Sequence, residues 1–366
     1  MKLKWLFCII LVTLLFFQSQ PTLLAANLGQ IDFILNKNVL DEQDKQEIDR
    51  YVRDTLQSLL NERNLANVGR YVEALVARRG DKPQYVQAFN DSVEKHVSEA
   101  FASAKSLRPA KRQTAITANL LILLDKLANV RFAILAMNQL DNENVVVRYW
   151  AVQCLTNPEV INQLNAGDAP NPNLAREITT KFKDMAPKSN PEILNLMARY
   201  AAAIQIPQGQ ELLLQIADQR IKSYADNKVT GEFTDATILK LLDSKISNPS
   251  QNTDVPALAQ RFAQLYSYVI QKYVRNKDKL SEVQKNQLIT VIVEIEDKCI
   301  KNMVGAQTEM RKAIEQDQMT ALMSEHDKLL GSDTAEGQLP AKYHFNYGKT
   351  NTGATRTAPL TLPNPA

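Results

Sequence analysis

Residues 143–157 read ENVVVRYWAVQCLTN, and this stretch decides the fold class. On a helix from Val145 to Leu155 one face is apolar, and it carries Val147, Trp150, Ala151, Cys154 and Leu155. Just before it, the segment RFAILAMNQL (131–140) has the composition of a short helix, and the polar residues DNEN (141–144) connect the two. A short polar connection between two helices is typical of an antiparallel helical hairpin.

Working outward, the rest of the chain favours the same class of structure. Glycine is scarce, with 11 in 366 residues, and alternating apolar and polar residues are nearly absent. Apolar residues recur instead at steps of three and four, which predicts an all-α protein. Further helices are expected over 41–62, 64–79, 83–105, 107–128, 190–206, 210–225, 253–274, 281–303 and 307–330. Pro207 to Gly209 is expected to be a turn between two of them.

The N-terminus reads MKLKWLFCIILVTLLFFQSQPTLLAA. Lys2 and Lys4 precede an apolar run from Trp5 to Phe17 that is short for a membrane span, and small residues follow. This is the layout of a secretory signal peptide, so residues 1–26 are expected to be removed on export to the periplasm or beyond. An uncleaved anchor is the alternative, because leucine stands three residues before the cut. The predicted regions are a signal peptide (1–26), a linker (27–40), an N-terminal helical region (41–127), a helical array (128–330) and a disordered tail (331–366).

The hairpin resembles a unit of the HEAT-repeat, or armadillo-like, α-solenoids. Val147, Arg148, Ala151 and Leu155 form V-R-x-x-A-x-x-x-L after an acidic turn, and the likeness covers about residues 131–155. It implies stacked antiparallel helix pairs, in a solenoid or right-handed superhelix; an irregular helical bundle is the alternative. The resemblance also implies that Arg148 pairs with Asp141 or Glu143.

In that family the second helices line a concave binding surface. The resemblance therefore makes Arg148, Tyr149 and Gln153 candidate partner-binding residues, and Arg199 and Tyr200 join them from a similar R-Y-A setting. Tyrosine and arginine are also enriched where proteins bind tightly. Ordinary packing against the next repeat is the other explanation of these residues.

The tail is rich in Gly, Pro, Thr and Asn and lacks helical periodicity, which predicts disorder. Tyr343, Phe345 and Tyr347 interrupt that pattern. They are either anchors on the chain's own helices or further partner-binding residues.

The search for catalytic motifs is negative. The chain has no Gly-rich phosphate loop, no nucleophile-elbow serine, no Cys-x-x-Cys and no His-Glu-x-x-His, and its three histidines are far apart in sequence. Glu294, Glu296 and Asp297 form the densest acidic group, which is expected to be a charged surface. Cys154 and Cys299 are expected to be buried free thiols, with a disulfide as the alternative. No catalytic, metal-binding or cofactor-binding residue is predicted.

The net charge limits the classes of partner that the sequence favours. The formal net charge is +3, and removal of residues 1–26 takes away two lysines and no acid, so nothing favours nucleic acid. No second apolar run reaches membrane-spanning length. The sequence predicts an exported scaffold or adaptor that binds a protein partner, and a glycan or lipid surface is a further possible contact. A helical enzyme acting on envelope polysaccharide, or a purely structural envelope component, is the alternative.

Overall fold

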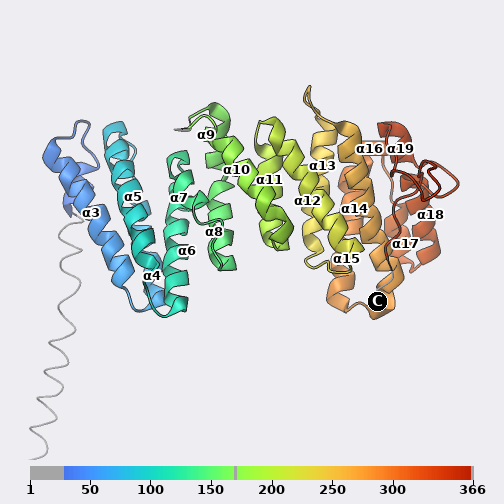
Figure 1. The fold of residues 1–366 in the computed structure, drawn as a ribbon, viewed down its shortest axis with the longest axis horizontal. Coiled ribbons are helices and arrows are strands. Elements are labelled where there is room, and N and C mark those ends of the chain that lie inside the picture. Colours follow the sequence, from blue (N-terminus) through green and yellow to red (C-terminus); the bar gives the residue numbers. More distant parts are fainter. Residues whose placement is uncertain (1–28, 169–170, 364–366) are drawn as a thin grey trace, which may run out of the picture. The chain divides into compact units, whose positions relative to one another are not determined.

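The computed structural model of the protein describes residues 29–168 and 171–363. The predicted signal peptide lies outside these residues. The chain divides into two compact units, one up to Asn157 and one from Pro158 onward. The regular secondary structure of the described residues is helical, apart from an isolated bridge between Lys349 and Thr355 (Figure 1). The all-α prediction is confirmed.

The first unit consists of helices that pack in pairs. They are α3 (Glu42–Asn61), η1 (Leu65–Asn67), α4 (Val68–Val76), α5 (Pro83–Ala104), α6 (Ala110–Leu127), η2 (Val130–Phe132), α7 (Ala133–Met137) and α8 (Val145–Leu155). Helix α3 packs on α5, while α4, α6 and α8 follow one another (Figure 1). Local sequence sets these helices: Asp41 and Asp44 form a capping box at the start of α3, and its stripe of Ile48, Val52, Leu56 and Leu59 is buried.

The predicted linker belongs partly to this unit. Residues 29–34 are helical, and Ile31 and Ile34 are buried. Asp32 accepts a hydrogen bond at 2.9 Å from the guanidinium of Arg78, two residues beyond the end of α4. Two isoleucines three residues apart lie on one side of a helical turn, and burying them holds this segment against the unit. The linker assignment is therefore corrected for residues 29–34.

The second unit has more helices. They are α9 (Pro158–Ala166), α10 (Leu174–Met185), η3 (Ala186–Lys188), α11 (Pro191–Ala203), α12 (Pro207–Ala225), α13 (Phe233–Ser247), α14 (Val255–Asn276), η4 (Lys277–Lys279), α15 (Glu282–Ile295), η5 (Glu296–Ile300), α16 (Lys301–Val304), α17 (Glu309–Glu315), α18 (Met319–Leu330) and α19 (Gln338–Tyr343). From α10 to α18 they form two rows. Helices α10, α12, α14 and α18 contact in turn, as do α11, α13, α15 and α17 (Figure 1).

Several predicted boundaries are corrected. The expected turn at Pro207–Gly209 is the first turn of α12, because proline is well suited to the first helical position. The segment 281–303 contains a π-helical turn, η5, between α15 and α16. The segment 307–330 is two helices, since Asp317 adopts a left-handed backbone conformation with φ of 57°. Helices α10, α13 and α19 were not predicted.

Helix α14 is the centre of the second unit. Every residue from Phe262 to Gln271 is buried, so the helix is covered on all sides. Helices α12, α13, α15 and α18 cover most of its surface. The remaining side is covered by residues that were predicted to be disordered.

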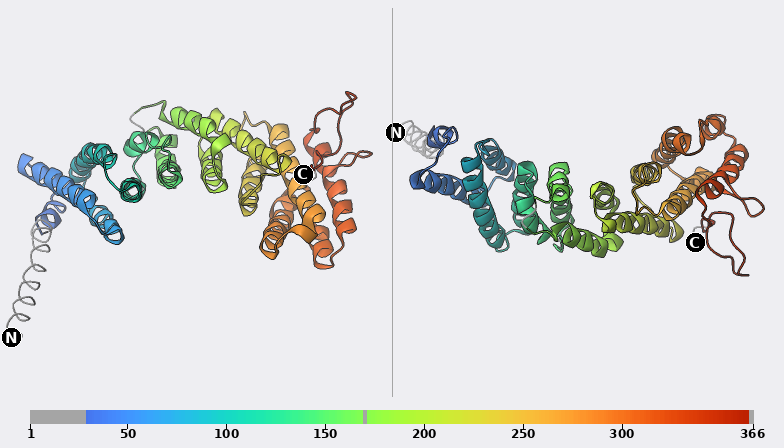
Figure 2. Two further views of the ribbon diagram at one scale, coloured as in Figure 1. Left: turned by 60° about the horizontal axis from the view of Figure 1, so that its bottom comes forward. Right: turned by 90° about the horizontal axis from the view of Figure 1, so that it is seen from above.

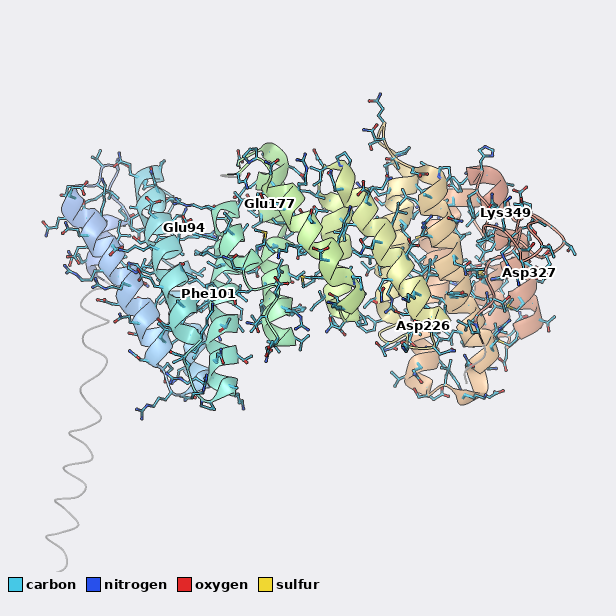
Figure 3. The ribbon with its side chains drawn as sticks, viewed as in Figure 1. Glu94, Phe101, Glu177, Asp226, Asp327 and Lys349 are labelled. Atoms are coloured by element: carbon cyan, nitrogen blue, oxygen red, sulfur yellow. The ribbon has the colours of Figure 1, made fainter. Side chains whose placement is uncertain are left out.

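The C-terminal segment packs on its own unit. Residues 344–363 are irregular in structure, but Phe345, Tyr347 and Leu362 are 8%, 7% and 3% exposed. Between these anchors the chain makes an exposed loop around Lys349, which projects beyond the helices (Figure 2; Lys349 is labelled in Figure 3). The prediction of a disordered tail is corrected for these anchored residues, because burying large apolar side chains offsets the entropy lost on ordering a terminus.

Candidate functional site

The candidate residues on α8 are half-buried. Arg148 donates from Nη1 to the carbonyl oxygens of Asn142 at 2.7 Å and Glu143 at 2.8 Å, so it ties the helix to the preceding turn through the backbone. Tyr149 packs edge-on against Trp150, with ring centroids 5.6 Å apart. Gln153 lies one turn further along the same helix. The structure thus gives Arg148 a structural contact and leaves Tyr149 and Gln153 partly accessible.

The two candidates on α11, Arg199 and Tyr200, differ in burial. Arg199 is exposed, whereas Tyr200 is completely buried. The Tyr200 hydroxyl donates to the carbonyl oxygen of Ala175 at 3.0 Å, and the ring packs edge-on against Phe182. The prediction that Tyr200 binds a partner is therefore wrong, because its side chain lies on the buried face of α11.

The aromatic side chains of the tail also make their contacts within the chain itself. Phe345 and Tyr347 pack edge-on at 5.4 Å, and the Tyr347 hydroxyl donates to the carbonyl oxygen of Leu330 at 2.8 Å. Tyr343 is half-buried, with the ammonium of Lys342 over its ring at 5.5 Å. The prediction that Phe345 and Tyr347 bind a partner is therefore corrected, because these side chains anchor the tail.

Residues 357–363, which we call the strap, run along α14. Gln264 and Gln271 are both 5% exposed, and their side chains bind the main chain of the strap. The Oε1 atoms accept the N–H groups of Leu360 at 2.8 Å and Leu362 at 2.7 Å, and both Nε2 groups donate to the carbonyl oxygen of Leu360. Arg275 donates to the carbonyl oxygen of Leu362 at 2.5 Å. These are contacts to backbone atoms, so they do not depend on the side chains of the strap.

Ser267 lies between the two glutamines and starts a hydrogen-bonded chain. Its Oγ is 2.8 Å from Nε2 of His326, and Nδ1 of His326 is 2.8 Å from Oδ1 of Asp327, a residue of α18 labelled in Figure 3. The order of groups is that of a Ser-His-Asp triad. However, Ser267 is fully buried in the middle of a helix, where backbone N–H groups are engaged in the helix and offer no oxyanion site. In this structure the chain of contacts joins α14 to α18.

Two shallow grooves flank α15 on the surface. The first groove, of about 350 Å³, lies between α15 and the start of α13 and is lined by Phe233, Ala236, Val283, Asn286, Gln287, Thr290, Val291 and Glu294. The second groove, of about 470 Å³, is lined by Ile289, Thr290, Val293, Glu294, Asp297, Lys298, Arg311, Ile314 and Glu315. Phe233 is 50% exposed and Val283 is 67% exposed. An exposed apolar patch in a hollow is typical of an interaction surface.

The acidic group lies at the rim of these grooves, and its three carboxylates have different roles. Glu294 accepts from Lys298 at 2.8 Å and from Lys240 at 3.0 Å, and these ammonium groups lower its pKa. Asp297 pairs with Arg311. Glu296 is 1% exposed, and burial raises its pKa. The expected charged surface holds for Glu294 and Asp297 but not for Glu296.

Glu296 instead caps a helix. Its carboxylate accepts the backbone N–H groups of Met310 at 2.8 Å and Arg311 at 2.9 Å, in the first turn of α17. Unpaired N–H groups at a helix start are satisfied in this way. The contact links η5 to α17.

A buried cluster lies between α12 and α13. Arg220 and Asp235 form two hydrogen bonds, and the Tyr224 hydroxyl donates to Asp235 at 2.8 Å. Burial and the nearby carboxylate raise the pKa of Tyr224, so the phenol stays protonated. At the edge of this cluster Lys272 of α14 binds Glu232 at 2.5 Å. The sequence did not predict that Arg220 is buried, because in the sequence of α12 this arginine has the pattern of an ordinary surface charge.

Within the described ranges, 29–168 and 171–363, no group of three or more His, Cys, Asp or Glu residues is placed to hold a metal ion. No helix in that part of the chain combines the length and the apolar character needed to cross a membrane. Comparison of the chain with models of known families, with curated proteins and with solved structures found no match.

Proposed function

We propose that the protein is an exported, non-catalytic scaffold that binds a protein partner through the first groove beside α15. The observation that carries this proposal is the exposure of Phe233 and Val283 at the two sides of an apolar hollow. Large apolar side chains exposed together lose unfavourable hydration when a partner covers them. Export rests on the N-terminal sequence pattern alone.

The form of the groove favours a helical partner segment. Its lining residues on α15 recur from Val283 through Gln287 and Thr290 to Glu294, a stripe of three helical turns, or about 16 Å. Helices α13 and α15 are neighbours in one row, and α14 packs against both. A partner helix would pack between α13 and α15 through a similar ridge-into-groove contact, with apolar residues spaced three and four apart.

The two-row packing of the second unit also supports a solenoid-like scaffold. In such proteins each helix pair is covered by its neighbours, and binding uses an extended helical surface instead of an enclosed pocket. We include the HEAT-like character of the chain in the proposal on the strength of the pattern around Arg148.

Site-specific photo-crosslinking tests the function. A benzophenone amino acid is placed at Thr290, which lies in both grooves, and at Thr180 of α10 as a control. The two threonines are matched: each is exposed within a helix and donates its hydroxyl to the carbonyl oxygen four residues earlier. Crosslinking is carried out in the native envelope fraction, and the products are identified by mass spectrometry.

The expected result is one protein crosslinked at Thr290 and not at Thr180, with the product lost in a Phe233→Ser/Val283→Ser variant. Equal products at both positions, or none at Thr290, would contradict the proposal. Binding or hydrolysis of envelope polysaccharide would then be assayed next.

A further inference from the structure

We propose that α14 carries a binding site for the main chain of an extended peptide, and that the strap is the ligand of this site in cis. The site binds a separate partner segment when the strap leaves. That segment is extended and uncharged, with a proline and a leucine three residues apart. The proposal is independent of the groove beside α15.

The first argument is the register of the contacts. In an extended chain the N–H and C=O of one residue point to the same side, and those of the next residue point to the other. The site contacts Leu360 and Leu362 at both groups and does not need Thr361, which is exposed. This is the hydrogen-bonding pattern of strand addition, with glutamine and arginine side chains in place of a neighbouring strand.

The second argument is that the site is built into the core. Gln264 and Gln271 are seven residues apart on α14, two helical turns on one face, with Ser267 between them. Gln271 is held in place because its Nε2 also donates to Oγ of Ser267 at 2.8 Å, and Ser267 in turn contacts His326. The strap main chain satisfies these amide groups, and without the strap water would have to take its place as their partner, so this face is suited to bind a peptide main chain.

The third argument concerns selectivity. Of the strap side chains, Pro359 and Leu362 are buried, whereas Leu360 and Thr361 are exposed. The strap 357–363 reads TAPLTLP and has no charge. A ligand therefore needs an apolar residue at two positions three apart, while the positions between them are free to vary.

The fourth argument is the connection of the strap. It is joined to the anchors Phe345 and Tyr347 by a loop whose residues 351–355 are all exposed. The loop closes on itself through the N–H of Thr350 and the carbonyl oxygen of Ala354 at 2.8 Å. Exchange of the strap breaks the hydrogen bond from Thr357 Oγ1 to the carbonyl oxygen of Ser332 at 2.7 Å. It requires no change in the helices, and Phe345 and Tyr347 can stay in place.

The test keeps the full chain and cuts this loop. A protease site is inserted after Asn351, and the purified protein is cleaved so that the strap is held without a covalent bond. A fluorescein-labelled peptide with the sequence of residues 355–363 is then added, and fluorescence anisotropy and gel filtration are measured. The uncut protein is the control, because a tethered strap competes at an effective concentration in the millimolar range.

We expect the cut protein to retain its own strap on gel filtration or to bind the labelled peptide saturably, and the uncut protein to bind at least ten-fold more weakly. Two variant peptides test the register. The Thr361→Asp peptide should bind with the affinity of the parent peptide, and the Leu362→Asp peptide should bind at least ten-fold more weakly. In the protein, Gln271→Leu should reduce peptide binding by a similar factor, with the helical content checked by circular dichroism.

The proposal is overturned if the cut protein loses its strap, stays folded and does not bind the labelled peptide. Equal binding of the two aspartate peptides would also overturn it. A dimer of the uncut protein that free peptide dissociates would show that the occupant is the strap of a second copy, against the assignment to a partner segment. Peptide binding is also measured with a Phe233→Ser/Val283→Ser variant, which alters the groove beside α15 and not the site on α14. This measurement distinguishes failure of the site from failure of the groove.

Discussion

Arg220 of α12 and Asp235 of α13 form a two-point contact in the core, with Nε to Oδ1 at 2.6 Å and Nη2 to Oδ2 at 3.0 Å. The side chains are 2% and 0% exposed. Arg220 also donates to the carbonyl oxygen of Thr230, so the pair fixes the connection between the two helices. A buried pair of this kind adds little net free energy of unfolding, but loss of one partner leaves an uncompensated charge.

Removing one partner of this pair should strongly destabilise the protein. Arg220→Met is expected to lower the free energy of unfolding by about 3–5 kcal/mol, measured by urea denaturation. Arg220→Met/Asp235→Leu should recover much of that loss, because no buried charge remains. The control is Arg261→Met, which breaks the more exposed pair with Asp218 and should cost less than about 1 kcal/mol. Equal losses for Arg220→Met and Arg261→Met would contradict this assignment.

The cap made by Glu296 should contribute more to the free energy of unfolding than the exposed ion pairs near it. Glu296→Ala leaves the N–H groups of Met310 and Arg311 without their acceptor, and we expect a loss of about 1–3 kcal/mol in the free energy of unfolding. Hydrogen exchange at these two amides should increase as well. Glu309→Ala, whose contact is an exposed pair with Lys312, is the control, and it should change the free energy of unfolding much less than Glu296→Ala does. Unchanged exchange at Met310 would contradict the cap.

The stability contributed by Glu294 should depend on pH. Its pKa is lowered in the folded state by Lys298 and Lys240, so the unfolded state binds the proton more readily. The contribution is present above the ordinary glutamate pKa and is lost as pH falls through the lowered value. We expect the difference in Tm between wild type and Glu294→Gln to shrink between about pH 5 and pH 3. The effect should stay below about 1 kcal/mol, since the pair is partly exposed. A difference that grows on acidification would contradict this sign.

Cys154 and Cys299 should not react in the native protein. Both are free and buried, and burial raises the pKa of each thiol above its usual range. The thiolate is the reactive form, so alkylation at neutral pH should be slow. Mass-spectrometric mapping after iodoacetamide is expected to find both thiols unmodified without denaturant and modified in 6–8 M urea, roughly the concentration that unfolds most small proteins. A disulfide between them in the purified protein would disprove the free-thiol assignment.

Two apolar residues of α15 should differ in their effect on stability. Leu288 is fully buried, and Leu288→Ala is expected to cost about 2–5 kcal/mol. Val283 is mostly exposed in the first groove, and Val283→Ser should change the free energy of unfolding by less than about 0.5 kcal/mol. This contrast, measured by urea denaturation, decides whether the groove variants test binding without unfolding the protein. A large loss for Val283→Ser would assign Val283 to the core.

The sequence predicted helices best where the signal was a long apolar stripe. Helices α3, α5 and α14 begin and end within three residues of their expected ranges. It missed α13, which has apolar residues on several sides because it contacts α11, α12, α14 and α15. It also missed α10, although Leu174, Ile178 and Phe182 form a buried stripe on that helix. The candidate site was predicted less well. Arg148 contacts the preceding turn, as the resemblance implied, but through the backbone carbonyl oxygens of Asn142 and Glu143. Tyr200 of α11, which the sequence offered as a contact residue, is buried.

What the sequence by itself determined is the all-α class, because the period of apolar residues along a helix is a local property of consecutive residues. Only the tertiary structure decided which polar side chains are buried and what they bind. Gln264 and the Leu360 main chain are 96 residues apart, and Arg220 and Asp235 come from different helices. A glutamine has the same local pattern on an exposed face as on a covered one. Its role is fixed by the segment that packs over it, here a strap whose buried proline and leucine offset the entropy of ordering the end of the chain.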